Sequence, residues 1–378
     1  MKHIFIIGAR GYHYNYGGWE TFVTNLVDNY NDKNTKFYIS ELSDVKKKVY
    51  SVTNNIMITP FKVNINGGVK MLLCTMKAFN YYISYIEKNN LDNCYIYILG
   101  LKLGPLLKLK KSKLKSLGIK VFVNPDGLEH ERSKWSYPVK KFFLLSEKWM
   151  LNNCDKIICD AKGIKTYINN KYPSLKNKTI YIAYGTNKID LCDTNEETIL
   201  DKYKLTKDNY ILMVGRFVPE NNFDMVINSF IETCINKKLV IISNISSNNN
   251  YYKKIIKETN CLEDKRIVFI DGIYNEKELT VIRKNAYAYI HGHSVGGTNP
   301  SLLEALNTTD INILYDVVFN KDVGGKSCLY FKNEEELVKI INSIEKYNKV
   351  KMGIECKKII QNNFTWEIIA KKYEEIFK

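Results

Sequence analysis

The chain has 378 residues, of which 45% are hydrophobic and 25% are charged, and this composition excludes a disordered chain and a fibrous repeat protein. Because one ordinary domain has roughly 100–200 residues, we expect two domains. The 56 Lys and Arg outnumber the 40 Asp and Glu, which gives a formal net charge of +16. This excess predicts an anionic partner: a nucleic acid, an acidic membrane surface or a phosphorylated small molecule. The alternative is a solvated, lysine-rich surface.

The predicted elements alternate between short apolar runs typical of buried strands and longer stretches with helical spacing. In the first half, strands are predicted at residues 3–8, 36–41, 55–61, 95–100, 120–124, 156–160 and 179–183, and helices at 19–29, 69–88, 138–151 and 161–170. A polar stretch at 186–208 is expected to link two domains. Beyond it, strands are predicted at 210–215, 238–243, 266–270, 288–291 and 311–315, and helices at 222–234, 276–285, 301–307 and 365–377.

This alternation predicts parallel sheets wrapped by helices, because parallel strands need crossover connections. We expect an α/β protein with two doubly wound, Rossmann-like domains, residues 1–190 and 191–360, that face each other across a cleft. Open sheets of this kind bind ligands at the carboxyl ends of their strands. Residues 361–378 are expected to form a C-terminal helix that packs back towards the N-terminal domain.

Nine scattered cysteines without a Cys-x-x-Cys pair argue for a reducing compartment and against a disulfide framework or a structural zinc site. The apolar run at the start of the chain ends at Gly8 and is too short for a signal peptide. No stretch reaches the roughly 18 apolar residues of a membrane span. We expect a cytoplasmic protein, with peripheral membrane contact left open.

A glycine-rich loop, residues 8–21, follows the first predicted strand and contains Gly17, Gly18 and Glu20. Glycines let a ligand approach the backbone, and free amides at a helix start favour an anion. The spacing is not Gly-x-Gly-x-x-Gly, which argues against a dinucleotide site. The alternative is an ordinary strand-to-helix turn.

A second polar segment, residues 124–135, follows the strand at 120–124 and crowds together Asp126, Glu129, His130, Arg132, Lys134 and Trp135. Carboxylates accept hydrogen bonds from sugar hydroxyls, a guanidinium can grip an oxyanion with two N–H groups, and an indole offers a flat apolar face. The alternative is an Asp-Gly turn before a helix start stabilised by ion pairs.

Two segments of the second half point to a phosphate group. Arg216 directly follows a predicted strand and can hold a diphosphate with two hydrogen bonds. The segment 291–306 also follows a strand, and its Gly-Gly-Thr-Asn turn opens a helix whose first amides favour phosphate. Glu304, one turn into that helix, suits ribose hydroxyls. His291 and His293 have no third ligand nearby in sequence, so we expect hydrogen-bonding histidines rather than metal ligands.

A basic stretch at residues 102–115 mixes leucines with lysines. Such a segment can lie on an anionic bilayer. The alternative is a surface helix with one buried stripe. No module that reads nucleic acid accompanies it, so we expect no nucleic-acid partner.

The sequences Gly-Arg-Phe-Val-Pro-Glu-Asn-Asn (215–222) and Gly-Gly-Thr-Asn-Pro-Ser-Leu-Leu-Glu-Ala (296–305) resemble the donor site of family 4 retaining glycosyltransferases of the GT-B fold. More narrowly, Gly-Gly-Trp-Glu-Thr (17–21) and Asp-Gly-Leu-Glu (126–129) with Lys-Trp (134–135) resemble the bacterial polysaccharide rhamnosyltransferase branch. The resemblance covers essentially the whole chain.

The resemblance implies a retaining transfer of L-rhamnose from dTDP-L-rhamnose to an undecaprenyl-diphosphate-linked saccharide in capsule or cell-wall polysaccharide synthesis. It implies no metal and no other cofactor. The protein would work in the cytoplasm, peripherally on the inner face of the cell membrane, with the anionic membrane surface as a partner. One alternative is a UDP-hexose transferase of the same fold; another is a non-catalytic basic protein that binds a membrane or nucleic acid.

The resemblance also implies roles for particular residues. The donor contacts would be Arg216, Asn221, His293, Gly296, Gly297, Thr298, Asn299, Ser301 and Glu304. The acceptor contacts would be Gly17, Gly18, Glu20, Arg132 and Lys134. Asp126, Glu129 and Arg216 are the candidate catalytic residues. The chain departs from the family at Gly296, which replaces the first glutamate of a paired motif, and at Asn221, which replaces a lysine; these changes fit a deoxysugar donor.

Overall fold

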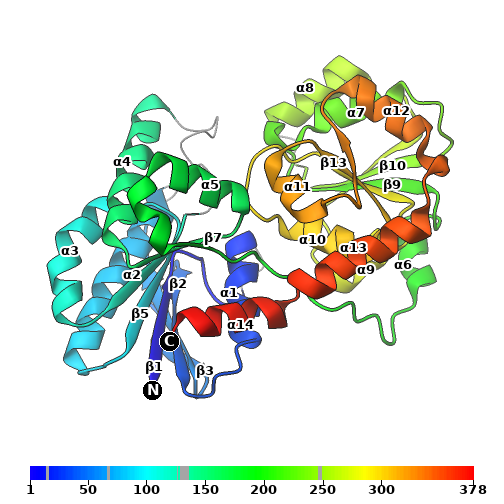
Figure 1. The fold of residues 1–378 in the computed structure, drawn as a ribbon. Helices are drawn as coiled ribbons and strands as arrows, with labels where there is room; N and C mark the ends of the chain where they lie inside the picture. The colour runs from blue at the N-terminus through cyan, green and yellow to red at the C-terminus, as the bar shows by residue number, and fades with distance from the viewer. Residues whose placement is uncertain (14–16, 66–68, 126, 128–135, 246–248) are drawn as a thin grey trace. The chain divides into compact units, whose positions relative to one another are not determined.

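The computed structural model describes residues 1–13, 17–65, 69–125, 127, 136–245 and 249–378. The chain forms two compact units, shown in Figure 1: unit 1 comprises residues 1–185 and 366–378, and unit 2 comprises residues 186–365. Within the described residues, unit 1 holds an eight-stranded sheet and unit 2 a six-stranded sheet. The predicted α/β fold with two domains and parallel sheets is confirmed.

The sheet of unit 1 has the strand order β3-β4-β2-β1-β5-β6-β7-β8. Its strands are β1 (Lys2–Ile7), β2 (Thr35–Ser43), β3 (Tyr50–Thr53), β4 (Ile56–Lys62), β5 (Cys94–Leu99), β6 (Lys120–Asn124), β7 (Lys156–Cys159) and β8 (Thr179–Tyr181). All pairs are parallel except β3 with β4. The sequence did not predict β3, because the strand has only four residues and all four are exposed.

Helices cover the sheet of unit 1: α1 (Gly18–Asp28), α2 (Val69–Lys88), α3 (Gly104–Ser116), α4 (Tyr137–Asn153), α5 (Lys162–Lys171), the 3₁₀-helix η2 (Pro173–Lys178) and α14 (Trp366–Ile376). The last of these returns to unit 1 from the far end of the chain. The hydroxyl oxygens of Tyr373 and Tyr97 lie 2.9 Å apart, and the Phe377 ring stacks on Phe122 with centroids 5.2 Å apart. These aromatic contacts attach α14 to the middle of the sheet.

The sheet of unit 2 has the strand order β11-β10-β9-β12-β13-β14, with every pair parallel. Its strands are β9 (Tyr210–Val214), β10 (Lys238–Ile242), β11 (Ile267–Ile270), β12 (Ala288–His291), β13 (Ile311–Tyr315) and β14 (Leu329–Phe331). Its helices are α6 (Glu196–Lys202), η3 (Pro219–Asn221), α7 (Phe223–Ile231), α8 (Asn250–Thr259), α9 (Glu276–Lys284), α10 (Pro300–Thr308), α11 (Val318–Gly324), α12 (Glu334–Asn342), η4 (Ile344–Lys346) and α13 (Lys349–Asn363).

Two expectations about the boundaries need correction. The chain passes between the units at 185/186 and 365/366, rather than at 190/191 and 360/361. The reason is a parallel bridge between Thr186 and Thr365, which places both residues in unit 2. The stretch 186–208, expected as a linker, contains helix α6, which is capped by Asn195 and paired with α9 through Glu196 and Lys284.

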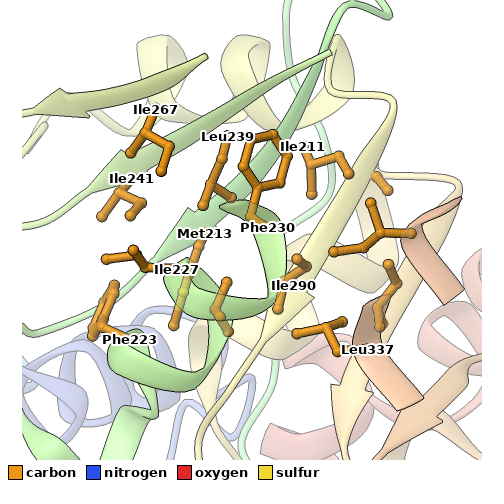
Figure 2. Close-up of a cluster of buried hydrophobic side chains, with 14 of the residues drawn as sticks. Ile211, Met213, Phe223, Ile227, Phe230, Leu239, Ile241, Ile267, Ile290 and Leu337 are labelled. Carbon is orange, nitrogen blue, oxygen red and sulfur yellow. The ribbon is translucent and has the colours of Figure 1, made fainter. Parts of the chain in front are cut away.

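One face of the unit 2 sheet packs against α7 and α12 around a buried apolar cluster (Figure 2). Phe223, Ile227 and Phe230 lie one helical turn apart on α7 and are fully buried. They contact strand residues such as Ile241 and Ile290, which also have no exposed area. Strands covered on both faces are apolar throughout, which explains the unbroken apolar runs in the sequence.

In the described ranges, no helix has both the length and the apolar character that crossing a membrane requires.

We expect Phe230→Ala to lower the free energy of unfolding by about 3–5 kcal/mol, because it removes a fully buried ring and leaves a cavity. Val350→Ala on α13, where the side chain is 68% exposed, is the control and should change stability by less than about 0.5 kcal/mol. Denaturant unfolding of the full chain measures both. Equal effects of the two substitutions would contradict the core described here.

Candidate functional site

The candidate site in unit 2 lies where the strand order changes direction. From β9 the chain runs outward to β10 and β11 on one side, and then returns to place β12 on the other side of β9. The helices that follow β9 and β12 lie on opposite faces of the sheet, since Phe223 of α7 belongs to one buried cluster and Ala305 of α10 to the other. Sheets of this type leave room for a ligand at that point.

The structure brings the two predicted phosphate segments together. The backbone nitrogen and the hydroxyl of Ser294 both donate to the Glu220 carbonyl, each at 2.9 Å. The side-chain amide of Asn222 donates to the Gly292 carbonyl at 2.8 Å. A Cβ at Gly292 would lie 2.3 Å from the Asn221 carbonyl oxygen, so only glycine fits there. These contacts fix the loop after β9 against the loop after β12.

The start of α10 supplies backbone amides beside these loops. Asn299 caps the helix by accepting a hydrogen bond from the Ser301 amide at 2.9 Å, and Pro300 fits the first position because it needs no N–H partner. A hollow lies next to this end, lined by His291, His293, Val295, Gly296, Gly297, Asn299, Phe319 and Asn320. Thr298 is buried behind it. The positive end of the helix dipole and the glycine-rich turn at 296–297 favour an anion at this position.

Arg216 supplies positive charge to the same region. Its side chain is exposed, and its charge helps to hold the pKa of His293 below the ordinary value. Asn221, which is buried, donates from its side-chain amide to the Arg216 carbonyl at 2.8 Å. This hydrogen bond fixes the backbone of Arg216, and therefore the point from which its side chain extends.

His291 and His293 form a stacked pair, with ring centroids 4.1 Å apart and planes inclined by 7°. Within the described residues, neither ring nitrogen of His291 has a hydrogen-bond partner, and neither has Nδ1 of His293. The described protein atoms thus supply no hydrogen bond to the His291 ring, which lies buried between Tyr289 and His293. Burial lowers the pKa of both imidazoles, to about 3 for His293, and keeps the pair neutral near pH 7.

Glu304 forms an ion pair with Arg283 that the sequence did not predict. Its Oε2 lies 2.7 Å from a guanidinium nitrogen of Arg283, a buried residue at the end of α9. Ser301 joins the network, since its hydroxyl lies 2.9 Å from the Tyr289 hydroxyl and accepts from Arg283 at 3.3 Å. Burial raises the pKa of Glu304, and Arg283 opposes this shift. The ion pair orients the carboxylate one turn inside α10.

The predicted residues of unit 1 divide into two groups. Gly17 and Gly18 lie at the start of α1, and the buried Glu20 accepts a hydrogen bond from the Arg10 amide at 2.8 Å. In this structure Glu20 stabilises the backbone of the glycine-rich loop. The second group, Asp126, Glu129, Arg132 and Lys134, lies outside the described residues.

The glycine-rich loop follows β1, which is the switch point of its own sheet because β1 pairs with both β2 and β5. Gly8 has φ of +109°, and a Cβ there would lie 2.4 Å from the Leu99 carbonyl oxygen. Only glycine allows the chain to turn so close to β5. The glycine-rich loop thus lies at the switch point of the unit 1 sheet, which is the position where an open sheet binds ligands.

Two functional residues were missed by reasoning from the sequence. Asn320 on α11 lines the hollow and donates to the carbonyl of His293 at 3.0 Å. Arg283 holds Glu304 from α9. Neither belongs to a motif near the residue that it contacts, and no local signal in the sequence marks either of them. Across the described residues, no group of three or more His, Cys, Asp or Glu side chains is placed to hold a metal ion.

Residues 1–187 match a family model described as "Domain of unknown function (DUF1972)". Two curated relatives are uncharacterized glycosyltransferases of Methanocaldococcus jannaschii. MJ1069 is 24% identical over 61% of this chain and 60% of its own length, and MJ1178 is 28% identical over 63% and 58%. The matched region thus spans about 60% of each relative.

Solved structures match the whole chain. Sucrose-phosphate synthase from Thermosynechococcus elongatus aligns with a TM-score of 0.78 at 15% identity, covering 100% of this chain and 98% of that one. HepE of Anabaena in complex with UDP-glucose aligns with a TM-score of 0.71 at 11% identity, covering 100% and 99%. The chain therefore has the two-domain α/β fold of GT-B glycosyltransferase structures, and its N-terminal half matches the DUF1972 family model.

The buried histidine pair predicts how stability depends on pH. Histidine in an unfolded chain titrates near 6.5, whereas the pKa of folded His293 is about 3. Between these values the unfolded chain binds more protons, so unit 2 should lose stability as the pH falls from about 7 towards 3. Thermal unfolding at a series of pH values should show a smaller loss for His293→Gln than for the wild type. His13→Gln, an exposed histidine of unit 1, is the control. An identical loss in H293Q would contradict the assignment.

Proposed function

We propose that the protein is a glycosyltransferase that moves a sugar from a nucleoside diphosphate sugar to an acceptor hydroxyl. The observation that carries this proposal is that the loop with Arg216 is hydrogen-bonded to the loop that leads into α10, beside a hollow lined by His293, Gly296 and Gly297. The similarity to two glycosyltransferases, and the fold shared with a structure that binds UDP-glucose, support it.

Each part of the site suits one part of the donor. Arg216 and the amides of residues 296–299 would bind the diphosphate and offset the negative charge that develops as it leaves. Glu304, oriented by Arg283, would accept hydrogen bonds from the ribose hydroxyls. Asn299 and Ser301 would hold the start of α10 in place through the cap that joins them. His293 would face the diphosphate from the wall of the hollow.

We further propose L-rhamnose as the sugar and dTDP-L-rhamnose as the donor. In the family 4 glycosyltransferases that the sequence resembles, a glutamate stands at the position of Gly296, so this site would lack a carboxylate that accepts from a hexose hydroxyl. A deoxysugar, with one hydroxyl fewer, fits this loss. The second candidate donor is a UDP-hexose, which the UDP-glucose complex of HepE favours.

The proposed acceptor is a lipid-diphosphate-linked saccharide used in capsule or cell-wall polysaccharide synthesis, at the inner face of the cell membrane. Gly17, Gly18 and Glu20 would shape the acceptor side, together with Asp126, Glu129, Arg132 and Lys134. The acceptor hydroxyl would enter from the face that the diphosphate leaves, which retains the configuration of the sugar. The chain would then act by holding both reactants in place and by stabilising charge, without a metal.

Thermal unfolding in the presence of dTDP, UDP, GDP and dTDP-L-rhamnose tests the donor. A ligand present at 100 times its Kd stabilises the folded state by about 2.7 kcal/mol, so the melting temperature should rise with the thymidine ligands. A larger rise with UDP would keep the glycosyltransferase and change the sugar. The absence of any rise would contradict the proposed function and favour the non-catalytic basic protein.

Arg216→Ala tests the diphosphate contact. We expect turnover with the preferred donor to fall by about 10²–10³-fold, because a preorganised contact to the developing charge is lost. Stability should change by less than about 0.5 kcal/mol, since the side chain is exposed. The control is Lys254→Ala, an exposed cation on α8. Unchanged turnover in R216A would show that the donor site lies elsewhere.

A further inference from the structure

Helices α3 and α4 are neighbours in unit 1 (Figure 1). The amide of Gly104 donates to the Ser146 hydroxyl at 2.9 Å, and a Cβ at Gly104 would lie 2.4 Å from the Ser146 carbonyl oxygen. The ammonium of Lys108 lies 5.0 Å from the centre of the Trp149 ring. The first part of α3 therefore packs against the second half of α4.

The charge on these two helices has one sign. Helix α3 carries five lysines and no acidic residue. Helix α4 carries three lysines and a single acidic residue, Glu147, whose side chain is buried and paired with Lys171 of α5. The outer sides of α3 and α4 therefore expose cations without any carboxylate of their own to neutralise them.

Apolar side chains stand among these cations. Leu109 of α3 is 81% exposed, and Phe142 and Leu145 of α4 are 38% and 45% exposed. On α4 the exposed residues recur with helical spacing, on the side opposite Met150 and Leu151, which are fully buried. Leu107 and Leu114 are buried and attach α3 to the core, as expected for a surface helix with one buried stripe. That buried stripe leaves Leu109 without a partner in the core.

We propose that an anionic lipid bilayer docks on the surface formed by Lys108, Leu109, Lys111, Lys141, Phe142 and Leu145, hereafter the α3–α4 surface. Lysines are drawn to acidic headgroups, while leucine and phenylalanine gain free energy by entering the boundary between headgroups and acyl chains. This inference rests on the proposed function, because a lipid-linked acceptor would be met at a membrane. It adds the surface of the chain that would contact that membrane. The sequence analysis considered only the basic stretch at 102–115 as a membrane contact. The proposed surface also includes residues of α4.

The apolar side chains favour a bilayer over nucleic acid. A nucleic-acid surface pairs cations with phosphates and stacks bases on aromatic rings, and exposed leucines add nothing to such a contact. A bilayer uses both kinds of side chain.

The test is co-sedimentation of the full chain with vesicles of phosphatidylglycerol and phosphatidylcholine in equal parts, and with vesicles of phosphatidylcholine alone. We expect binding to the acidic vesicles that weakens with salt. Each lysine near the surface is worth about fivefold in affinity, so Lys108→Ala, Lys111→Ala and Lys141→Ala together should weaken binding on the order of 100-fold. Leu109→Ser with Leu145→Ser should weaken it even at low salt.

Three lysines of α8 provide the matched control. Lys253→Ala, Lys254→Ala and Lys257→Ala remove the same charge from exposed positions of unit 2 and should leave vesicle binding unchanged. An equal loss in this control would overturn the proposal, because net charge alone would then explain the binding. No binding to acidic vesicles, tighter binding to duplex DNA, or full binding by the L109S/L145S chain would also overturn it.

Nucleotide binding separates this inference from the proposed function. All variants of the α3–α4 surface should keep the nucleotide-induced rise in melting temperature, because the donor site belongs to unit 2. If vesicle binding fails while that rise remains, only the docking surface is wrong. If vesicles bind while no nucleotide stabilises the chain, the docking surface stands and the proposed function fails.

Discussion

The parallel pairing of β9 with β12 is the constraint on which the candidate site depends. These strands are neighbours in the sheet but lie more than seventy residues apart in the chain, and the helices that follow them lie on opposite faces of the sheet. The pairing places Arg216 beside the loop that opens α10, and the hydrogen bonds from Ser294 and Asn222 join the two loops. Without this register, neither segment would contain enough donors to hold a diphosphate.

Charge in this region is distributed so that one cation stands alone. The two stacked histidines are neutral because burial disfavours their protonated forms, and the Arg283 guanidinium is already paired with Glu304. Among the described residues, Arg216 and the positive end of the α10 dipole therefore supply the positive potential near the hollow. In unit 1 the cations gather instead on the outer sides of α3 and α4. The proposed functions thus use two separate groups of cations. Arg216 would bind a small anion, and the lysines of α3 and α4 would bind a broad anionic surface.

Much of the fold could be predicted from the sequence, because strands buried on both faces are apolar throughout and the crossover helices carry one apolar side. Helices α8, α12 and α13 were missed although α8 and α12 are clearly amphipathic, whereas two other missed elements have weaker patterns. Strand β3 is wholly exposed, and α6 owes its place to Asn195 and to the ion pair of Glu196 rather than to a long apolar side.

The site shows the same division. The Gly-Gly-Thr-Asn turn was expected to open a helix at 301–307, and the structure begins α10 one residue earlier, at Pro300, where Asn299 caps it. The partnership of Arg283 with Glu304 and the stacking of His291 on His293 depend on tertiary contacts that no local pattern encodes. Asn221 was expected to touch the donor, and the structure shows it bonded to the backbone of Arg216.

The central claim is that unit 2 binds a nucleoside diphosphate between Arg216 and α10. A crystal structure of the full chain with dTDP bound tests it most directly. The account predicts phosphate oxygens within hydrogen-bonding distance of the Arg216 guanidinium and of the amides of residues 296–299, with the ribose at Glu304. A nucleotide bound at the glycine-rich loop of unit 1, or with its phosphates away from the start of α10, would contradict it.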